Sequence, residues 1–256
     1  MRTVRYEKLR PDEILHVIKT NPIAYLAIGP LEWHGPAMPY GTDPAAAYEA
    51  ALSAAKQTGG VVLPPIYAGT ERERSEEILD AMGFQDTSQY IIGQDFPANC
   101  IPSLYFREEI FSLIIREYLR LLVKQGFRLI VIVNGHGATN QWEVLNRLAI
   151  EFSNECDCFV HVTMAIDSDD PEMKYEGHAT RSEHAVQMYL HKEDVDLSLL
   201  PPKPEKLRGC EWGINGAMTY ALMPNEDKTV EEQCDPRNAT SEAGERFFNA
   251  GVKKLV

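Results

Sequence analysis

The alternation of short apolar segments with longer amphipathic ones most constrains the fold of this chain. Apolar, β-branched runs predict strands near residues 23–29, 60–67, 128–133 and 158–166. Segments with helical periodicity predict helices near residues 11–20, 44–57, 107–125, 140–154, 180–191 and 241–255. This alternation is typical of β-α units, in which helices cover both faces of a largely parallel sheet. We therefore predict an α/β fold, an α-β-α sandwich with a mostly parallel central sheet.

Length and composition favour a single domain over residues 1–256. The hydrophobic share of 44% suffices for a sizeable core, and no stretch resembles a Gly/Ser-rich or charged linker. Two irregular stretches, residues 70–103 and 201–238, interrupt the pattern. Long irregular segments inside a compact domain are typically lids or binding loops. The second stretch could instead cover a subunit interface.

Charge and the N-terminal sequence exclude several classes of protein. The formal net charge is −13, whereas a general nucleic-acid binder needs clustered Lys and Arg. The polar N-terminus lacks the apolar region of a signal peptide, and no window approaches the length of a membrane span. We expect a cytoplasmic protein that binds neither nucleic acid nor membrane. The cysteines have neither metal-knuckle nor redox spacing and are predicted to be reduced and mostly structural: Cys100, Cys156, Cys158, Cys210 and Cys234.

The first cluster of potential metal ligands follows the segment over residues 23–29. Glu32 and His34 are two residues apart, so in an extended backbone their side chains point the same way while Trp33 faces the other. Asp43 comes after a short loop, directly before Pro44 and a helical segment. Two carboxylates and an imidazole suit zinc or manganese. Alternatively, Asp43 is a helix N-cap before a proline, and the other two are polar loop residues.

A second cluster, Asn134-Gly135-His136-Gly137, directly follows the strand near residues 128–133. His136 therefore lies at the carboxyl end of a buried strand, where open α/β sheets bind their ligands. The alternative is a strand-to-helix turn whose glycines supply unusual backbone angles. The chain has no glycine-rich phosphate loop after its first strand, which disfavours a nucleotide-binding Rossmann protein.

The third cluster opens the helix predicted over residues 180–191. It contains His178, Glu183 and His184. Thr180-x-x-Glu183 has the pattern of a capping box, in which Glu183 folds back to the helix start. Glu183 is therefore either a cap or a metal ligand, and we favour the ligand. His184 fits a packed or solvated helix face.

These clusters together resemble the creatininase (creatinine amidohydrolase) family over most of the chain. The family shows Glu-x-His-Gly-Pro followed by Gly-Thr-Asp, then Asn-Gly-His-Gly, His-Ala-x-x-x-Glu and Asp-Pro-Arg-x-Ala-Thr. All of them occur here in that order, the last at residues 235–240. Each motif is modest alone, but four in register are a specific signal.

The resemblance implies a two-metal hydrolase. Its metal ligands would be Glu32, His34, Asp43, His136 and Glu183. Asp43 would bridge two divalent ions, with Glu32 and His136 on one ion and the remaining pair on the other. The expected ions are Zn²⁺ or Mn²⁺, with Fe²⁺ as an alternative. His178 would be catalytic, positioning the substrate carbonyl or transferring a proton. The family also implies a homo-oligomer, a hexamer.

Departures from creatininase proper concern the substrate. That enzyme resembles this chain but has a metal-binding carboxylate where Ala138 stands and a Tyr where Gly137 stands. The stretch after residue 70 also differs, and Thr70, Arg72 and Arg74 are candidate substrate-binding residues there. The two arginines suit an anionic or polyhydroxyl group, although charge-rich loops are usually only solvated.

We predict a metal-dependent hydrolase that attacks a carbonyl of a small polar substrate, at the C–N bond of a cyclic amide or formamide. The same metal chemistry would serve C–C ring opening of a cyclic polyol ketone of the inosose type. A catalytically silent metal-binding member of the family is the other alternative, and the intact ligand set argues against it.

Overall fold

The computed structural model describes residues 2–93, 95–97, 99, 101–167, 169–175, 177–210, 213–215 and 228–256. Its centre is a parallel sheet with the strand order β2-β1-β4-β5, and a further short strand, β3, pairs with β1. The strands are β1 (Ile23–Gly29), β2 (Val61–Val62), β3 (Ile66–Tyr67), β4 (Leu129–Asn134) and β5 (Phe159–Met164). The central strands β1 and β4 are buried almost throughout, as continuous apolar runs require in a sheet covered on both faces.

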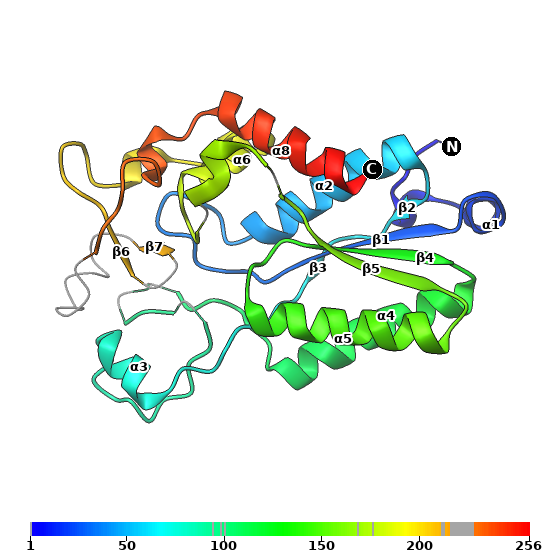
Figure 1. Ribbon diagram of the computed structural model, residues 1–256, viewed down its shortest axis with the longest axis horizontal. Helices are drawn as coiled ribbons and strands as arrows, with labels where there is room; N and C mark the ends of the chain where they lie inside the picture. Colours follow the sequence, from blue (N-terminus) through cyan, green and yellow to red (C-terminus); the bar gives the residue numbers. More distant parts are fainter. Residues whose placement is uncertain are drawn as a thin grey trace.

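Helices cover both faces of this sheet (Figure 1). One face carries α2 (Thr42–Thr58), α6 (Arg181–Leu190) and α8 (Ser241–Leu255). The other face carries α4 (Glu108–Gln125) and α5 (Thr139–Glu155), and α1 (Pro11–Thr20) joins the same core. Successive residues of β1 alternate between the two cores, so that Leu26 packs with α4 and α5 whereas Ala27 packs with α2.

The predicted α/β sandwich is confirmed, and each predicted helix is present within two residues of its expected bounds. The single strand predicted over residues 60–67 is wrong, because Pro64 and Pro65 divide it into β2 and β3. Proline has no N–H to donate to a sheet ladder, so it interrupts the strand.

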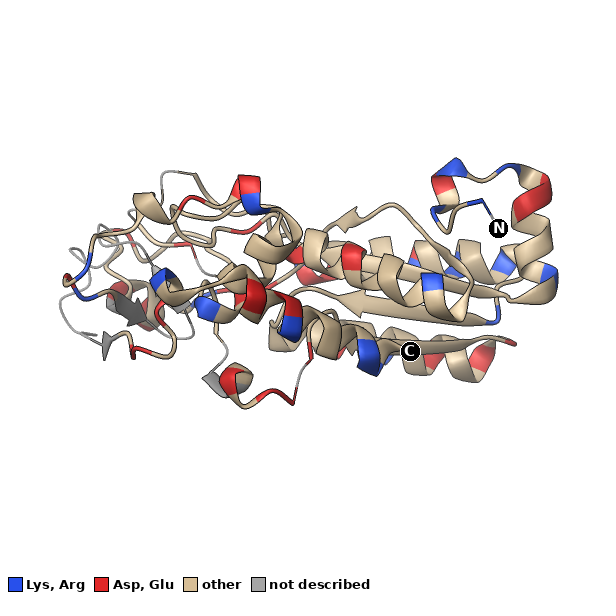
Figure 2. Cartoon of the chain, turned by 90° about the horizontal axis from the view of Figure 1, so that it is seen from above, with Lys and Arg blue, Asp and Glu red and all other residues tan. Residues whose placement is uncertain are grey.

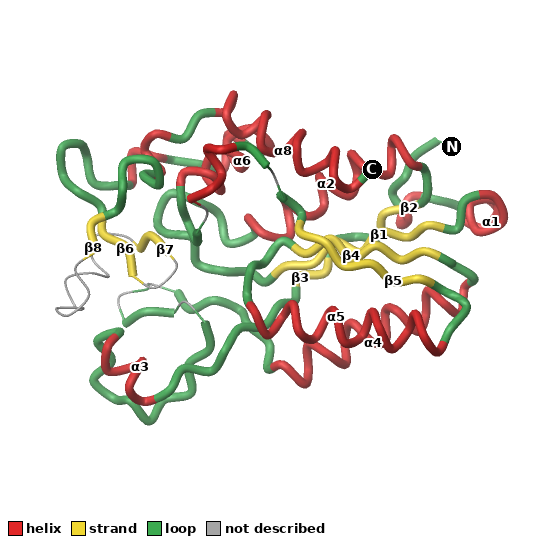
Figure 3. Tube along the Cα trace, in the orientation of Figure 1, coloured by secondary structure: helices red, strands yellow, loops and turns green. Residues whose placement is uncertain are grey.

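Irregular segments gather at one end of the molecule, beyond the carboxyl ends of the strands (Figure 3). They include α3 (Glu76–Ala81), which the sequence did not predict, and a small antiparallel sheet of β6 (Arg208–Cys210), β7 (Gly213–Asn215) and β8 (Lys228–Thr229). The 3-10 helices are η1 (Tyr6–Lys8), η2 (Pro171–Tyr175), η3 (Lys192–Asp194), η4 (Leu197–Leu199) and η5 (Pro236–Asn238). Both termini lie at the opposite end, and Figure 2 shows basic and acidic residues interspersed along the chain.

Two further sequence predictions concern helices and thiols. None of the described helices is both long and apolar enough to cross a bilayer. Cys156, Cys158 and Cys234 form no disulfide, in agreement with the predicted reduced state. Cys100 and the side chain of Cys210 lie outside the described residues. Burial raises the pKa of Cys158 to about 11, as expected for an unreactive structural thiol.

Candidate metal centre

The first predicted cluster lies just past the carboxyl end of β1. Glu32 and His34 are each 1% exposed, and Nδ1 of His34 hydrogen-bonds to the backbone carbonyl of Glu32 at 3.0 Å. Because a carbonyl only accepts, Nδ1 carries the proton and Nε2 of the neutral ring holds a lone pair. The Tyr105 hydroxyl donates to Oε1 of Glu32 and so helps to orient that carboxylate.

Asp43 lies inside the first turn of α2. The N-cap of this helix is Gly41, and no side chain caps it, so the interpretation of Asp43 as an N-cap is wrong. The carboxylate instead faces two imidazoles. Its Oδ1 lies 3.1 Å from Nε2 of His34, and its Oδ2 lies 3.1 Å from Nδ1 of His136. One buried carboxylate thus connects the first motif with the second.

A close approach of β1 and β4 to the start of α2 permits this geometry. A Cβ added at Gly29 would lie 2.7 Å from Cβ of Asp43, and a Cβ added at Gly135 would lie 2.2 Å from its backbone oxygen. Packing therefore requires both glycines. Gly135 and Gly137 do not have positive φ angles, so the predicted role of these glycines as sources of unusual backbone angles is wrong.

Buried amides hold the turn that carries His136. Oδ1 of Asn134 accepts from the His136 backbone N–H at 3.2 Å, and Nδ2 donates to the His136 carbonyl at 2.6 Å. Gln141 donates to the same Oδ1 at 2.7 Å and accepts from the backbone N–H of Thr70 at 2.8 Å. These bonds orient His136 so that Nδ1 lies 3.0 Å from Oε2 of Glu32.

Glu183, in the first turn of α6, approaches from the helix side. Its Oε2 lies 3.8 Å from Nε2 of His34 and accepts a hydrogen bond from the backbone N–H of Ala179 at 2.5 Å. The capping box with Thr180 does not form. The Thr180 side chain accepts no helical N–H, and Glu183 accepts the backbone N–H of Ala179 and not that of Thr180. Glu183 therefore both braces the helix start and faces His34. His184 is 1% exposed and lies on a packed helix face.

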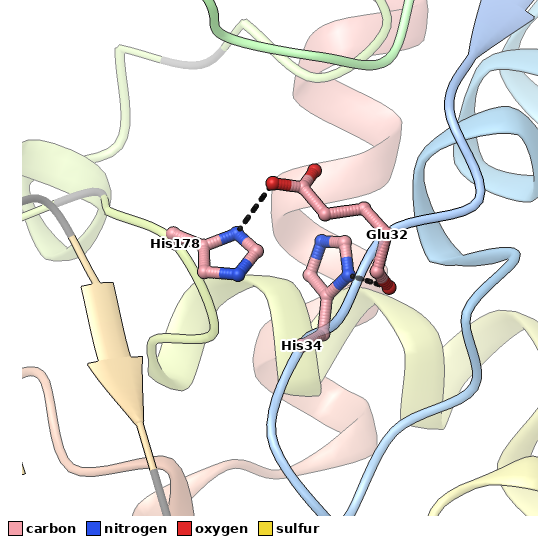
Figure 4. Close-up of side chains that lie close together, drawn as sticks. All are labelled: Glu32, His34 and His178. Carbon is pink, nitrogen blue, oxygen red and sulfur yellow. Dashed lines mark hydrogen bonds and ion pairs between the residues drawn. The ribbon is translucent and has the colours of Figure 1, made fainter. Parts of the chain in front are cut away.

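His178 lies in the segment before α6, and its ring faces the carboxylate of Glu32 (Figure 4). Nδ1 is 3.5 Å from Oε1 of Glu32, and the ring centroid is 4.4 Å from that of His34. Nε2 donates to the backbone carbonyl of Trp33, so the lone pair of the neutral ring is on Nδ1. Burial lowers the pKa of His178 to about 4, which keeps the ring neutral near pH 7.

Burial and charge oppose each other among these groups. Burial by itself would raise the pKa of Glu32, but the neighbouring imidazoles, His136 foremost, hold it well below its usual range. Burial would lower the pKa of His34, but the carboxylates of Asp43 and Glu183 raise it to about 10. For Glu183 burial dominates and raises the pKa to about 7. Carboxylates in this interior are thus stabilised by positive charge, which a bound cation would also supply.

The donor atoms form groups of the size that holds a divalent ion. Within each group the donors lie no more than 4.8 Å apart, and the groups are Glu32, Asp43 and His136; His34, Asp43 and Glu183; and Glu32, His34 and His178. Nε2 of His34 is buried without a hydrogen-bond partner, although Oδ1 of Asp43 is only 3.1 Å away. An imidazole nitrogen and a carboxylate oxygen this close together, both buried, would also fit as two ligands of one cation. Imidazole and carboxylate donors without thiolates suit Zn²⁺ or Mn²⁺.

A cavity of about 600 Å³ adjoins these donors. Arg72 and Arg74 line it together with Asp43 and His136, and Nε of Arg74 donates to the Gly93 carbonyl at 2.9 Å. Thr70 is fully buried and, among the described residues, is not part of the cavity wall, so its contact with substrate stays a prediction.

The fourth motif braces the chain around α6. Asp235 is 4% exposed and pairs with Arg237, Oδ2 lying 2.7 Å from Nη2. Nη1 of Arg237 donates to the carbonyls of Pro201 and Glu205 at 2.8 Å, and the Thr240 hydroxyl caps α8. These contacts give the motif a structural role.

Sequence reasoning missed three residues that orient the donors: Asn134, Gln141 and Tyr105. Asn134 belongs to the motif Asn134-Gly135-His136-Gly137, and a polar amide at the end of a buried strand could have indicated that it orients His136. Gln141 and Tyr105 had no local signal, because their contacts with Thr70 and Glu32 span 71 and 73 residues of sequence.

Comparisons with known proteins identify the family and agree with the fold. The profile of the family described as "Creatininase: Creatinine amidohydrolase" matches residues 7–256. Among solved structures, the chain is similar to one named "Creatininase Mn", with 19% identity and a TM-score of 0.70 over 99% of this chain and 96% of that chain. A creatininase variant of "Zn-Zn type" has 18% identity and a TM-score of 0.68, covering 100% of this chain and 96% of that chain. A Bacteroides fragilis protein has 23% identity and a TM-score of 0.62, covering 91% of this chain and 87% of that chain. No curated protein matches.

The chain belongs to the creatininase family. The family resemblance inferred from the four motifs is therefore confirmed. Manganese and zinc, the metals named for two of the similar structures, are also the metals that the donor set of this chain suits.

Proposed function

We propose that this chain is a metal-dependent hydrolase that attacks a carbonyl of a small polar substrate, at the C–N bond of a cyclic amide or formamide. The observation that carries the proposal is the carboxylate of Asp43, whose oxygens each lie 3.1 Å from an imidazole nitrogen, one of His34 and one of His136. A carboxylate shared in this way would hold two cations at the short separation that two-metal catalysis needs.

Two divalent ions fit the donors, Zn²⁺ or Mn²⁺ with Fe²⁺ as an alternative. Glu32 and His136 would hold one ion, His34 and Glu183 would hold the other, and Asp43 would contact both. When bound, such ions lower the pKa of water and polarise a carbonyl, so that no serine or cysteine nucleophile is needed.

We assign proton transfer to His178. The Trp33 carbonyl engages Nε2, so the lone pair of Nδ1 is directed toward the donors, 3.5 Å from Oε1 of Glu32. With a pKa of about 4, the ring is unprotonated at neutral pH and is free to accept a proton there. The same nitrogen would return the proton to the leaving nitrogen.

The cavity supports a substrate other than creatinine. Gly137 lines it, and a Cβ at this position would meet nothing within 4 Å, whereas creatininase proper is expected to carry a Tyr there. Ala138 also lines the cavity, in place of the expected carboxylate. Arg72 and Arg74 would bind an anionic or polyhydroxyl part of the substrate.

Metal analysis combined with a substrate screen tests the proposal. Mass spectrometry of the purified protein should detect two divalent ions per chain, and the metal-loaded protein should turn over a cyclic amide or a formamide. Turnover only on inososes would favour C–C ring opening, and two bound ions without any turnover would favour a silent family member. A protein that binds no divalent ion would refute the proposal. The homo-oligomer implied by the resemblance is checked by sedimentation velocity on the same preparation.

A further inference from the structure

One buried polar side chain on the cavity wall has an unpaired oxygen. Gln187 lies on α6, one helical turn beyond Glu183, and is 2% exposed. It lines the cavity together with Glu183, Asp43 and His136. Its Oε1 is buried and has no hydrogen-bond partner among the described residues.

A second buried glutamine provides the contrast. Gln141 is fully buried, but its Oε1 accepts from the Thr70 backbone N–H at 2.8 Å and its Nε2 donates to Asn134 at 2.7 Å. Buried amides are normally satisfied in this way, because an unpaired buried carbonyl has given up its hydrogen bonds to water. The part of the chain that the structure describes supplies a partner for the carbonyl of Gln141 and none for that of Gln187.

The surroundings of Gln187 indicate what kind of partner is missing. On α6 it is flanked along the wall by Val186 and Ser182, and the Ser182 hydroxyl already pairs with that of Thr180 at 3.0 Å. The end of β5 and the segment that follows it add apolar residues to the wall: Met164, Ala165, Ile166 and Met173. An unpaired buried acceptor on a wall that also carries these apolar side chains favours a small ligand that donates a hydrogen bond at that point.

We propose that Gln187 is a substrate-binding residue whose carbonyl accepts the amide N–H of the substrate. The proposal rests on the proposed function, because it assigns the substrate class of the same cavity. Residues at positions i and i+4 of a helix are about 5–6 Å apart. A small ligand whose carbonyl lies at the metal-ligating groups beside Glu183 can therefore reach Gln187 with its N–H. An unsubstituted lactam carries C=O and N–H on one edge and fits this arrangement. The substrate is then an amide with a free N–H, and an N-alkylated amide is discriminated against.

The first measurement separates a binding role from a structural one. Gln187→Met keeps the length of the side chain and removes an unpaired carbonyl oxygen, so the Tm of the metal-free protein should stay within about 2 °C of the wild type. Gln141→Met is the matched control, and its Tm should fall by several degrees because it leaves the backbone N–H of Thr70 unpaired and removes one hydrogen bond from Oδ1 of Asn134. A fall for Gln187→Met as large as that of the control would overturn the proposal.

The second measurement uses a pair of probes that differ in one hydrogen-bond donor. Calorimetry on the metal-loaded protein compares 2-pyrrolidinone with N-methyl-2-pyrrolidinone. The wild type should bind the N–H lactam on the order of tenfold more tightly, and Gln187→Met should bind both with the same affinity. The proposal would be overturned if the wild type and Gln187→Met preferred the N–H lactam over the N-methyl lactam to the same extent. It would also be overturned if the wild type did not bind the N–H lactam. An N–H preference that depends on Gln187, in a protein that hydrolyses no amide, would refute the hydrolase and leave this binding role standing.

Discussion

Two groups of potential metal ligands share Asp43, and the fold orients the side chains of one group more strictly than those of the other. The strand-side group is Glu32, Asp43 and His136, and the helix-side group is His34, Asp43 and Glu183. All members of the strand-side group are buried, and Asn134 clamps the turn that carries His136. In the helix-side group, the Glu183 side chain is 32% exposed, and its Oε2 also accepts the N–H of Ala179.

This difference predicts unequal affinities for metal. An ion in the strand-side group would meet ligands that hydrogen bonds already orient, and such orientation raises metal affinity. An ion in the helix-side group would share the Glu183 oxygen with a backbone N–H and would lie nearer to water. We therefore expect the strand-side ion to bind more tightly and the helix-side ion to exchange faster.

The largest effect is expected for Asp43→Asn, which removes the anionic ligand from both groups at once. Both ions should be lost in mass spectrometry of the purified variant, and turnover should fall by on the order of 10⁴ or more. Asp12→Asn changes an exposed carboxylate on α1 in the same way and should alter neither quantity. Full retention of one ion by Asp43→Asn would show that the two groups do not share this ligand.

His178→Ala should come next, because His178 is proposed to move a proton and to bind no metal. Turnover should fall by on the order of 10²–10⁴, the usual range for losing a general acid or base, while both ions stay bound. His16→Ala removes an exposed imidazole and serves as the control. Loss of an ion from His178→Ala would make His178 a ligand, in keeping with the third donor group of Glu32, His34 and His178.

Glu183→Gln tests the asymmetry directly. The amide still accepts the N–H of Ala179, so the helix start should stay intact, but the charge that faces His34 is gone. The variant should bind one ion with wild-type affinity and the other roughly 10–100-fold more weakly, as titration of the metal-free protein would measure. Glu193→Gln, at an exposed position, should leave both affinities unchanged. Two unchanged affinities in Glu183→Gln would mean that Glu183 only braces the helix.

Local pattern predicted the fold and most of the donors, because each depends on a few consecutive residues. The strands and helices follow from periodicity, and Glu32, His34 and His136 stand where apolar strands end. The pattern at Asp43 was ambiguous, since an aspartate before a proline also fits an N-cap. Its packing against Gly135, which directly follows the distant strand β4, distinguishes the two interpretations.

Residues that orient the donors were not predictable in the same way. The hydrogen bonds of Gln141 and Tyr105 join segments that are about 70 residues apart, and nothing local marks either side chain. The unpaired oxygen of Gln187 is likewise visible only when the surroundings of α6 are known. Such features follow from tertiary contacts, whereas the ends of strands follow from the sequence.

The last effect is expected on stability and not on turnover or metal affinity, and it concerns His34 of the helix-side group. In the metal-free protein the carboxylates of Asp43 and Glu183 outweigh burial and raise the pKa of His34 to about 10, from an ordinary value of 6.5. A raised pKa means that the folded state holds a proton that the unfolded chain releases. The stabilisation is therefore complete below pH 6.5 and is lost as the pH rises toward 10, a decrease on the order of a few kcal/mol.

With metal bound, the dependence of stability on pH should reverse, because the ion binds the deprotonated imidazole and protons compete with it at low pH. Thermal melts with EDTA and with added Mn²⁺ across this range measure how stability depends on pH in each state. His34→Asn should reduce the slope of the EDTA profile, to which His136 also contributes because neighbouring carboxylates raise its pKa. A metal-free protein whose Tm rises between pH 6.5 and 10 would contradict the coupling of His34 to Asp43 and would remove the electrostatic reason for a helix-side site.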